Sequence, residues 1–243
     1  MAQRVLVVGG SEEFVGAPYL AGIAALRAGA ESVIIMAPKK VAWAINALSP
    51  DLMTRKLKGK YLSRAHERAI QKQMKTADIL LLGNGAGTRP GTASLMRSLM
   101  RFSIPKVVDA DALKVLRNDQ VQNAILTPSE SEWKLLEKQN DIKKLLAKNI
   151  IVRKGFPTKI LSGTRTLTVR RVNKGLKKAG TGDCLAGLCA GYLAAGLSPL
   201  AATQKACKTG NTIANILARR KHGYHFLASD LVHEMRRSRI LRA

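Results

Sequence analysis

Short apolar runs alternate along most of the chain with longer segments in which apolar residues recur at three- and four-residue spacing. The runs predict strands at residues 5–8, 32–37, 79–82, 106–109, 124–127 and 150–153. The segments between them predict helices, for example at residues 17–29, 92–102 and 111–116. Strands that are apolar on both faces and alternate with helices are typical of an α/β fold, with a mainly parallel sheet and helices on both faces.

The pattern changes after residue 157. Two short runs at 158–161 and 165–172 flank Ser162-Gly163-Thr164, and this arrangement predicts an antiparallel hairpin. Three helices are expected after the hairpin, at residues 181–196, 199–220 and 229–239. Because no long linker, low-complexity tract or internal repeat interrupts the series, we expect residues 1–243 to form a single domain.

The segment Gly180-Thr181-Gly182-Asp183 opens the first of these three helices. Its glycines allow a tight turn with exposed amides, and the helix N-terminus carries a partial positive charge, so the segment can hold an oxyanion. Asp183 would lie beside that anion, where a carboxylate can take a proton from a substrate hydroxyl. The same residues also fit an ordinary glycine-rich turn in which Asp183 caps the helix.

Gly-Thr-Gly-Asp before a small-residue helix resembles the anion hole and catalytic base of the ribokinase-like kinases. Further segments in the same order make the chain similar to the nucleotide-dependent NAD(P)H-hydrate dehydratases. They are residues 9–18 and 24–30, residues 107–113, residues 126–128 with Glu132, and residues 223–230. The match spans nearly the whole chain, and it implies a ribokinase-like three-layer sandwich.

The resemblance implies an ADP- or ATP-dependent NAD(P)H-hydrate dehydratase, a lyase of metabolite repair. The C6 hydroxyl of the hydrated nicotinamide (S epimer) would be phosphorylated, and elimination of phosphate would restore NAD(P)H. Asp183 would remove the hydroxyl proton, while the amides of Ala179, Gly180, Thr181 and Gly182 would hold the phosphoryl group. Magnesium would offset the polyphosphate charge without a metal site of the protein's own. A homo-oligomer and an NAD(P)H-hydrate epimerase in the same pathway are the implied partners.

A glycine-rich loop at residues 83–88 follows a predicted strand and precedes a helix, so its backbone can approach a ligand closely. The loop lacks the Gly-Lys-Ser/Thr ending of a Walker loop and is not a full dinucleotide fingerprint. The resemblance implies that Gly85 and Gly87 contact the substrate. The family usually has a proline where Asn84 stands.

Carboxylates follow the next two predicted strands. Asp109 and Asp111 end a strand in Val-Val-Asp-Ala-Asp, where they can order a magnesium-bound water or a substrate hydroxyl. Asp111 also fits as the cap of the next helix. The resemblance implies that Asp109 and Glu132 contact the substrate, although Ser129 with Glu132 equally predicts a capping box.

Lys154 follows the last parallel strand, where a cationic side chain suits a polyphosphate, and the resemblance assigns it to the nucleotide. In the opening segment, Gly16 and Ala17 precede the helix-starting Pro18. The resemblance implies that Gly16 and Ala17 contact the nicotinamide dinucleotide. Phe14 stands where the family often has a tyrosine, and it can stack but cannot donate a hydrogen bond.

Charge adds a question about partners. The chain has 41 Lys and Arg against 16 Asp and Glu, a net charge of +25, which attracts nucleotides, dinucleotides or nucleic acid. A solvated basic face is the plain alternative. Aromatic residues make up only 4%, which argues against a surface that stacks single-stranded bases, and no helix-turn-helix or RNA-binding motif is recognisable.

Two alternative functions stay open. Another ribokinase-like kinase, acting on a vitamin precursor or a sugar, would share Gly180–Asp183 but not Gly16-Ala17-Pro18. A nucleic-acid-associated protein on the same scaffold would account for the charge, for Asn84 and for Lys177-Lys178. The three cysteines suggest neither a disulfide framework nor a zinc site. No membrane-spanning run or signal-peptide pattern is present, so a cytoplasmic protein is expected.

Overall fold

A single continuous sheet runs through the chain. The computed structural model describes residues 3–117, 120–170, 172–220 and 223–237, and within them the strand order is β3-β2-β1-β4-β5-β6-β7-β8-β9. The strands are β1 (Arg4–Val8), β2 (Ser32–Pro38), β3 (Met53–Leu57), β4 (Ile79–Leu82), β5 (Lys106–Val108), β6 (Ala124–Leu126), β7 (Asn149–Arg153), β8 (Thr158–Ser162) and β9 (Arg165–Val169).

The sheet is parallel from β3 to β7, and β8 pairs antiparallel with both β7 and β9. This confirms the predicted mainly parallel sheet and the hairpin after residue 157. The hairpin's second strand ends at Val169, earlier than the predicted 165–172, and Arg171 lies outside the described residues.

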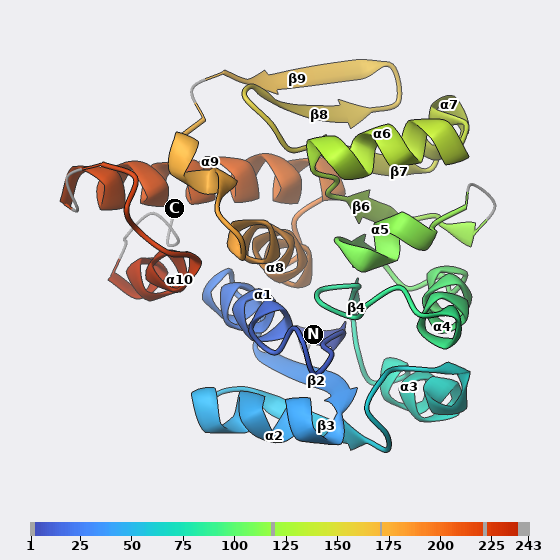
Figure 1. Cartoon of the computed structure of the whole chain (residues 1–243). Coiled ribbons are helices and arrows are strands. Elements are labelled where there is room, and N and C mark those ends of the chain that lie inside the picture. Colours follow the sequence, from blue (N-terminus) through green and yellow to red (C-terminus); the bar gives the residue numbers. More distant parts are fainter. Residues whose placement is uncertain (1–2, 118–119, 171, 221–222, 238–243) are drawn as a thin grey trace.

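Helices cover both faces of the sheet, as predicted (Figure 1). One face carries α1 (Gly16–Arg27), α2 (Lys39–Leu48), α8 (Thr181–Ala194), α9 (Pro199–Arg220) and α10 (Ala228–Arg237). The other carries α3 (Glu67–Met74), α4 (Pro90–Met100), α5 (Asp111–Val115), α6 (Glu130–Gln139) and α7 (Ile142–Leu146). Short 3₁₀ turns lie at Arg64–His66 and Lys174–Lys177. None of the helices described is long and apolar enough to cross a membrane.

Side chains of β1 show why the apolar runs predicted buried strands. Val5 and Val7 pack into the core beneath α1 and α8, whereas Leu6 and Val8 pack into the opposite core. Alternate residues of a strand point to opposite faces, so a strand covered on both sides must be apolar throughout.

The edge strand β3 was not among the predicted strands. Its sequence is Met-Thr-Arg-Lys-Leu, and Arg55 and Lys56 are exposed. Charged side chains are typical of edge strands, where they discourage pairing with another chain, and here they conceal the apolar pattern.

The order in which the chain adds strands to the sheet reverses between β1 and β4. Strands β2 and β3 lie on one side of β1, and the strands from β4 onward lie on its other side, so the chain leaves β1 and β4 in opposite directions. Such a switch point at the carboxyl ends of parallel strands is where ligands bind in open α/β sheets. Helix α8 lies close against α1, because any side chain at Gly187 would overlap the backbone oxygen of Ala21. This contact sets the N-terminus of α8 beside the switch point.

Lys106 is fully buried at the start of β5, at the amino ends of the parallel strands and so away from their carboxyl ends. Its Nζ donates one hydrogen bond of 2.8 Å to the backbone oxygen of Gln122. Burial lowers the pKa of Lys106 to about 8. The unfolded chain therefore binds this proton more tightly, and the free energy of unfolding should rise with pH between about 8 and 10.5.

We predict that Lys106→Met raises the free energy of unfolding at pH 7 by about 1–3 kcal/mol, because a desolvated ammonium is replaced by an apolar side chain of similar length. The advantage should shrink at pH 10, where the wild-type lysine folds in its neutral form. Urea unfolding at both pH values measures the difference, with the exposed Lys148→Met as the control. Equal pH dependence in wild type and Lys106→Met would contradict the prediction.

Candidate active site

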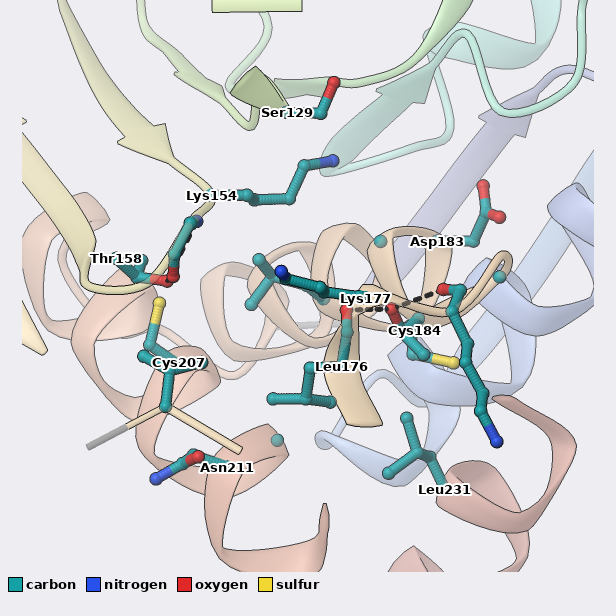
Figure 2. Close-up of a pocket in the computed structure, with 18 of the residues that line it drawn as sticks. Ser129, Lys154, Thr158, Leu176, Lys177, Asp183, Cys184, Cys207, Asn211 and Leu231 are labelled. Carbon is teal, nitrogen blue, oxygen red and sulfur yellow. Dashed lines mark hydrogen bonds between the residues drawn. The ribbon is translucent and has the colours of Figure 1, made fainter. Parts of the chain in front are cut away.

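A cavity of about 700 Å³ lies between the carboxyl end of the sheet, the N-terminus of α8 and the middle of α9. It is large enough for a small-molecule ligand the size of a nucleotide. The site residues predicted from the sequence that line it are Asp109, Glu132, Lys154, Ala179, Gly180, Thr181, Gly182 and Asp183. Segments more than 70 residues apart in the sequence thus meet in one cavity (Figure 2).

The segment before α8 is held in a tight turn. Gly180 has φ +85°, and a side chain there would lie 2.7 Å from Leu20 Cδ1. Thr181 Oγ1 donates to the backbone oxygens of Leu176 (2.6 Å) and Lys178 (2.8 Å). Because the first amides of a helix lack acceptors within it and carry the positive end of its dipole, the turn presents Gly182 as an anion-binding position.

Lys154 supplies the cation next to this turn. A side-chain carbon at Gly182 would lie 3.0 Å from Lys154 Nζ, so the ammonium stands directly beside the helix N-terminus. Lys154 Nζ also donates to Asp109 Oδ1 at 2.9 Å, and Thr127 Oγ1 donates to the same oxygen at 2.7 Å. Burial alone lowers the pKa of Lys154, but the surrounding carboxylates of Asp109, Glu132 and Asp183 outweigh it and raise that pKa. Lys154 therefore stays charged in the cavity.

Asp183 lies in the first turn of α8, and its Oδ1 accepts a 2.6 Å hydrogen bond from Asn84 Nδ2. Burial, followed by the charge of Asp109, raises the pKa of Asp183 to about 7, against the opposing effects of Asn84 and Lys154. A carboxylate with a pKa near neutrality is both present in the ionised form and basic enough to accept a proton at pH 7. Asp183 has the properties of a general base.

The two aspartates after β5 point in different directions. Ala110 lies between them with φ 50° and ψ −121°, in the left-handed region of φ that an alanine rarely adopts. Asp109 faces the cavity, whereas Asp111 accepts from the amide of Gly87 (2.8 Å) and from Lys114 Nζ (2.7 Å). Asp111 makes no cap for α5, so that alternative is wrong: its carboxylate is turned to the 83–88 loop instead.

Glu132 has a structural partner as well as a place at the cavity. Its Oε2 accepts from the amide of Ser129 (2.8 Å) and from Ser129 Oγ (2.7 Å), which confirms the capping box predicted for α6. One carboxylate oxygen is thus used to begin the helix. The side chain still lines the cavity and contributes to the charge around Lys154.

The remaining predicted residues lie at the start of α1 and on the loop after β4, both at the switch point. A side-chain carbon at Gly85 would lie 3.1 Å from Ala17 Cβ and 2.7 Å from Phe14 Cβ, so the loops after β1 and β4 are in contact. Gly16 is next to Ala17 at the start of α1. Neither these residues nor Gly87 line the 700 Å³ cavity. Asn84 connects the two regions, because it precedes Gly85 and contacts Asp183.

Sequence reasoning noted Asn84 only as a departure from the family's proline. The structure shows it fully buried, with Nδ2 donating to Asp109 Oδ2 (3.1 Å) as well as to Asp183. An amide in the middle of a glycine-rich loop at a strand end was the available signal. Asn84 and Asp183 are 99 positions apart, so spacing alone could not pair them.

Comparison with known proteins identifies the family of the chain. The model of the NAD(P)H-hydrate dehydratase family matches residues 5–237. A bifunctional NAD(P)H-hydrate repair enzyme of Methanothermobacter thermautotrophicus is 36% identical over 250 residues, covering 94% of this chain and 48% of the relative. An ADP-dependent (S)-NAD(P)H-hydrate dehydratase of Cenarchaeum symbiosum is 34% identical, covering 94% of this chain and 85% of the relative. The chain spans about half the length of the bifunctional relatives it matches.

Solved structures share the fold. A ribokinase-like superfamily protein of Enterococcus faecalis superposes with a TM-score of 0.80 at 21% identity, covering 96% of this chain and 87% of the other. The ADP/ATP-dependent NAD(P)H-hydrate dehydratase of Bacillus subtilis, co-crystallised with ATP and Mg²⁺, superposes with a TM-score of 0.75 at 23% identity, covering 96% and 88%. With its three-layer ribokinase-like fold, the chain belongs to the NAD(P)H-hydrate dehydratase family.

Proposed function

We propose that this chain dehydrates hydrated NAD(P)H, the S epimer, at the expense of ADP or ATP, and so repairs the cofactor. The observation that carries the proposal is the placement of Asp183, with a pKa of about 7, beside the N-terminus of α8 and Lys154 in one cavity. A base, an anion-binding turn and a cation at one point are the parts that phosphoryl transfer requires. The family match over residues 5–237 supports this function over that of another ribokinase-like kinase.

In this mechanism, Asp183 takes the proton from the C6 hydroxyl of the hydrated nicotinamide as the hydroxyl oxygen attacks the terminal phosphorus of the nucleotide. The phosphorus–oxygen bond to the leaving nucleotide breaks, and the turn at Ala179–Gly182 and Lys154 stabilise the charge on the transferring group. Phosphate then departs from C6, and loss of a proton from C5 restores the double bond of NAD(P)H.

Magnesium fits this site as an ion carried by the nucleotide. Among the described residues, no three His, Cys, Asp or Glu side chains gather as a metal-binding cluster. Mg²⁺ keeps several waters and binds through phosphates and one or two carboxylates, and Glu132 lines the cavity with only Oε2 committed to Ser129. Glu132 is therefore the side chain that would hold the ion, which neutralises phosphate charge when bound.

The dinucleotide side of the site belongs to the loops at the switch point. Gly16 and Ala17, with Gly85 and Gly87, would let the backbone approach the hydrated nicotinamide from the face opposite the nucleotide. Asp109 is held between Lys154 and Asn84 and would orient the substrate hydroxyl. These roles are part of the proposal.

The wider setting is proposed on the same basis. We treat residues 1–243 as one domain, since one sheet runs through the described residues. The relatives named bifunctional are about twice as long as the part that this chain matches, which supports a second activity, an NAD(P)H-hydrate epimerase, acting in the same pathway. A homo-oligomer remains a prediction. A cytoplasmic location is also a prediction, and it is supported by the proposed substrate, which is a damaged form of a metabolic cofactor.

The test is to incubate the purified protein with hydrated NADH or NADPH, Mg²⁺ and either ADP or ATP, and to follow the absorbance of the reduced nicotinamide. Recovery of that absorbance with one of the nucleotides, and none without nucleotide, is expected. The activity and the binding of duplex DNA are then both measured over one range of salt concentrations, to test whether the net charge of +25 serves nucleic acid. Binding through surface phosphate contacts weakens steeply with salt. Tight duplex binding at physiological salt with no dehydration by any nucleotide would overturn the proposal.

A further inference from the structure

Asn84 joins two carboxylates that would otherwise repel each other. Its Nδ2 has two hydrogens, and it donates one hydrogen bond to Asp183 Oδ1 (2.6 Å) and one to Asp109 Oδ2 (3.1 Å). Hydrogen bonds from an amide to ionised oxygens are stronger than those between neutral groups, more so away from water. The Asn84 side chain, fully buried, is the direct link between these two acids.

Chemistry fixes which way the amide is turned. The reversed orientation would place Asn84 Oδ1 against two carboxylate oxygens, and an oxygen without a hydrogen cannot donate to either. In the present orientation Oδ1 is buried and makes no hydrogen bond within the part of the chain that the structure describes. An unpaired buried acceptor is unfavourable, so the two bonds of Nδ2 determine the conformation.

The link is anchored at both ends. Asp109 Oδ1 receives hydrogen bonds from Lys154 Nζ and Thr127 Oγ1, which leaves Oδ2 directed at Asn84. The backbone of Asn84 is held by Gly10, whose amide donates to the backbone oxygen of Asn84 at 2.9 Å. A side chain at Gly9 would lie 2.5 Å from that oxygen, so β1 and β4 approach too closely there for Asn84 to shift. The Asp183 carboxylate is thereby tied to a rigid part of the sheet.

We propose that Asn84 is the positioning residue of the general base: it orients the Asp183 carboxylate toward the reacting hydroxyl and favours its ionised form. The inference rests on the proposed function, because it assigns Asp183 as the base. It goes beyond that function in giving a defined role to a residue that stands where the family usually has proline.

The charged groups around Asp183 determine how strongly Asn84 acts. Asp109 and Asp111, on the segment after β5, disfavour ionisation, and Lys154 at the end of β7 favours it, while Glu132 on α6 acts through its charge on Lys154. Among the residues that the structure describes, Asn84 is the one that hydrogen-bonds the carboxylate of Asp183 directly, and this bond lowers the pKa of Asp183. Removing this bond should therefore raise the pKa of Asp183, because burial and the charges of Asp109 and Asp111 are then less strongly opposed.

The first experiment compares the pH profile of kcat/KM for hydrated NADH in wild type, Asn84→Ala and Asn84→Asp. Because the base must be ionised and kcat/KM reports the pKa of the free enzyme, the wild-type value of kcat/KM should rise with pH with a midpoint near 7. Asn84→Ala should move that midpoint up by about one unit. It should also lower kcat at pH 7 by about 10–100-fold, because the base is less ionised and less well oriented. The KM for nucleotide should change little. Asn84→Asp, nearly isosteric, should shift the midpoint further because it adds a third carboxyl group.

The matched control is Asn149→Ala. Asn149 is also buried, and its amide donates to the backbone oxygens of Val121 (3.2 Å) and Leu145 (2.9 Å), at the edge of the sheet away from the cavity. Its loss should lower the unfolding temperature without moving the pH midpoint. If Asn84→Ala does not fold, Asn84→Asp carries the test. A midpoint within 0.2 units of wild type in a folded Asn84 variant would overturn the proposal.

A second measurement separates this proposal from the proposed function. The carboxyl carbon of Asp183 can be followed by NMR in ¹³C-aspartate-labelled protein, with the signal assigned by its absence in Asp183→Asn. Its titration midpoint should rise in Asn84→Ala whether or not the protein dehydrates hydrated NADH. An inactive wild type with this shift would remove the function and keep the link, whereas an active wild type without it would remove the link alone.

Discussion

Asp183→Asn should lower the nucleotide-driven dehydration rate by about 10²–10⁴-fold, the usual cost of removing a general base. The amide keeps the size of the carboxylate but cannot accept the hydroxyl proton. The rest of the anion-binding turn is unchanged, because Thr181 fixes it through the oxygens of Leu176 and Lys178. Nucleotide affinity, measured by calorimetry, should therefore stay within about threefold of wild type, while kcat collapses.

Stability provides an independent check on the same variant. Because burial, followed by the charge of Asp109, raises the folded-state pKa of Asp183 from 3.8 to about 7, the free energy of unfolding falls as pH rises from about 4 to about 7, and the penalty levels off above that. Asp183→Asn should consequently unfold at an equal or higher urea concentration than wild type at pH 8. Asp141→Asn, at the N-cap of α7, is the control for the same chemical change away from the cavity. If Asp183→Asn retains more than half of the wild-type turnover, Asp183 is not the base.

The alternation of strands and helices was predictable because both faces of the central strands are buried. Val5 to Val8 read as a strand since each residue packs into one core or the other. Strand β3 failed the same criterion because Arg55 and Lys56 face water at the edge of the sheet. The hydrophobic pattern therefore identified the strands that are covered on both faces, and it missed the edge strand β3, which pairs with β2.

The site was predictable to the extent that its residues follow strand ends. Asp109 and Lys154 come after β5 and β7, so a parallel sheet brings them to one edge, where their 2.9 Å ion pair forms. Two features needed the three-dimensional structure. The backbone of Ala110 turns Asp111 away from the cavity toward Gly87, and the amide of Asn84 meets Asp183 only because α8 packs against α1. Both depend on packing that local sequence does not encode.

Gly182→Val should abolish turnover, with a loss of at least about 10²-fold, comparable to removing a donor from an oxyanion hole. The first carbon of the new side chain would lie 3.0 Å from Lys154 Nζ, and its methyl groups would enter the space between the ammonium and the helix N-terminus. In the proposed mechanism, that space holds the transferring phosphoryl group. In contrast to Asp183→Asn, this variant should lose nucleotide affinity as well, because the same atoms hold the ground-state phosphates.

The control for Gly182→Val is Gly91→Val, because the two glycines occupy the same position in their helices, the second residue of α8 and of α4. Gly91 is exposed, and a side-chain carbon there would make an ordinary contact of 3.5 Å with Ser63 Cβ, so valine carries the same propensity cost without entering the cavity. Both variants should unfold within about 1 kcal/mol of each other in urea, since valine in a first helical turn is only mildly unfavourable. Gly91→Val should retain wild-type kinetics. Wild-type kinetics in a folded Gly182→Val protein would show that the phosphoryl group is held elsewhere, because no phosphate could share the turn with that side chain.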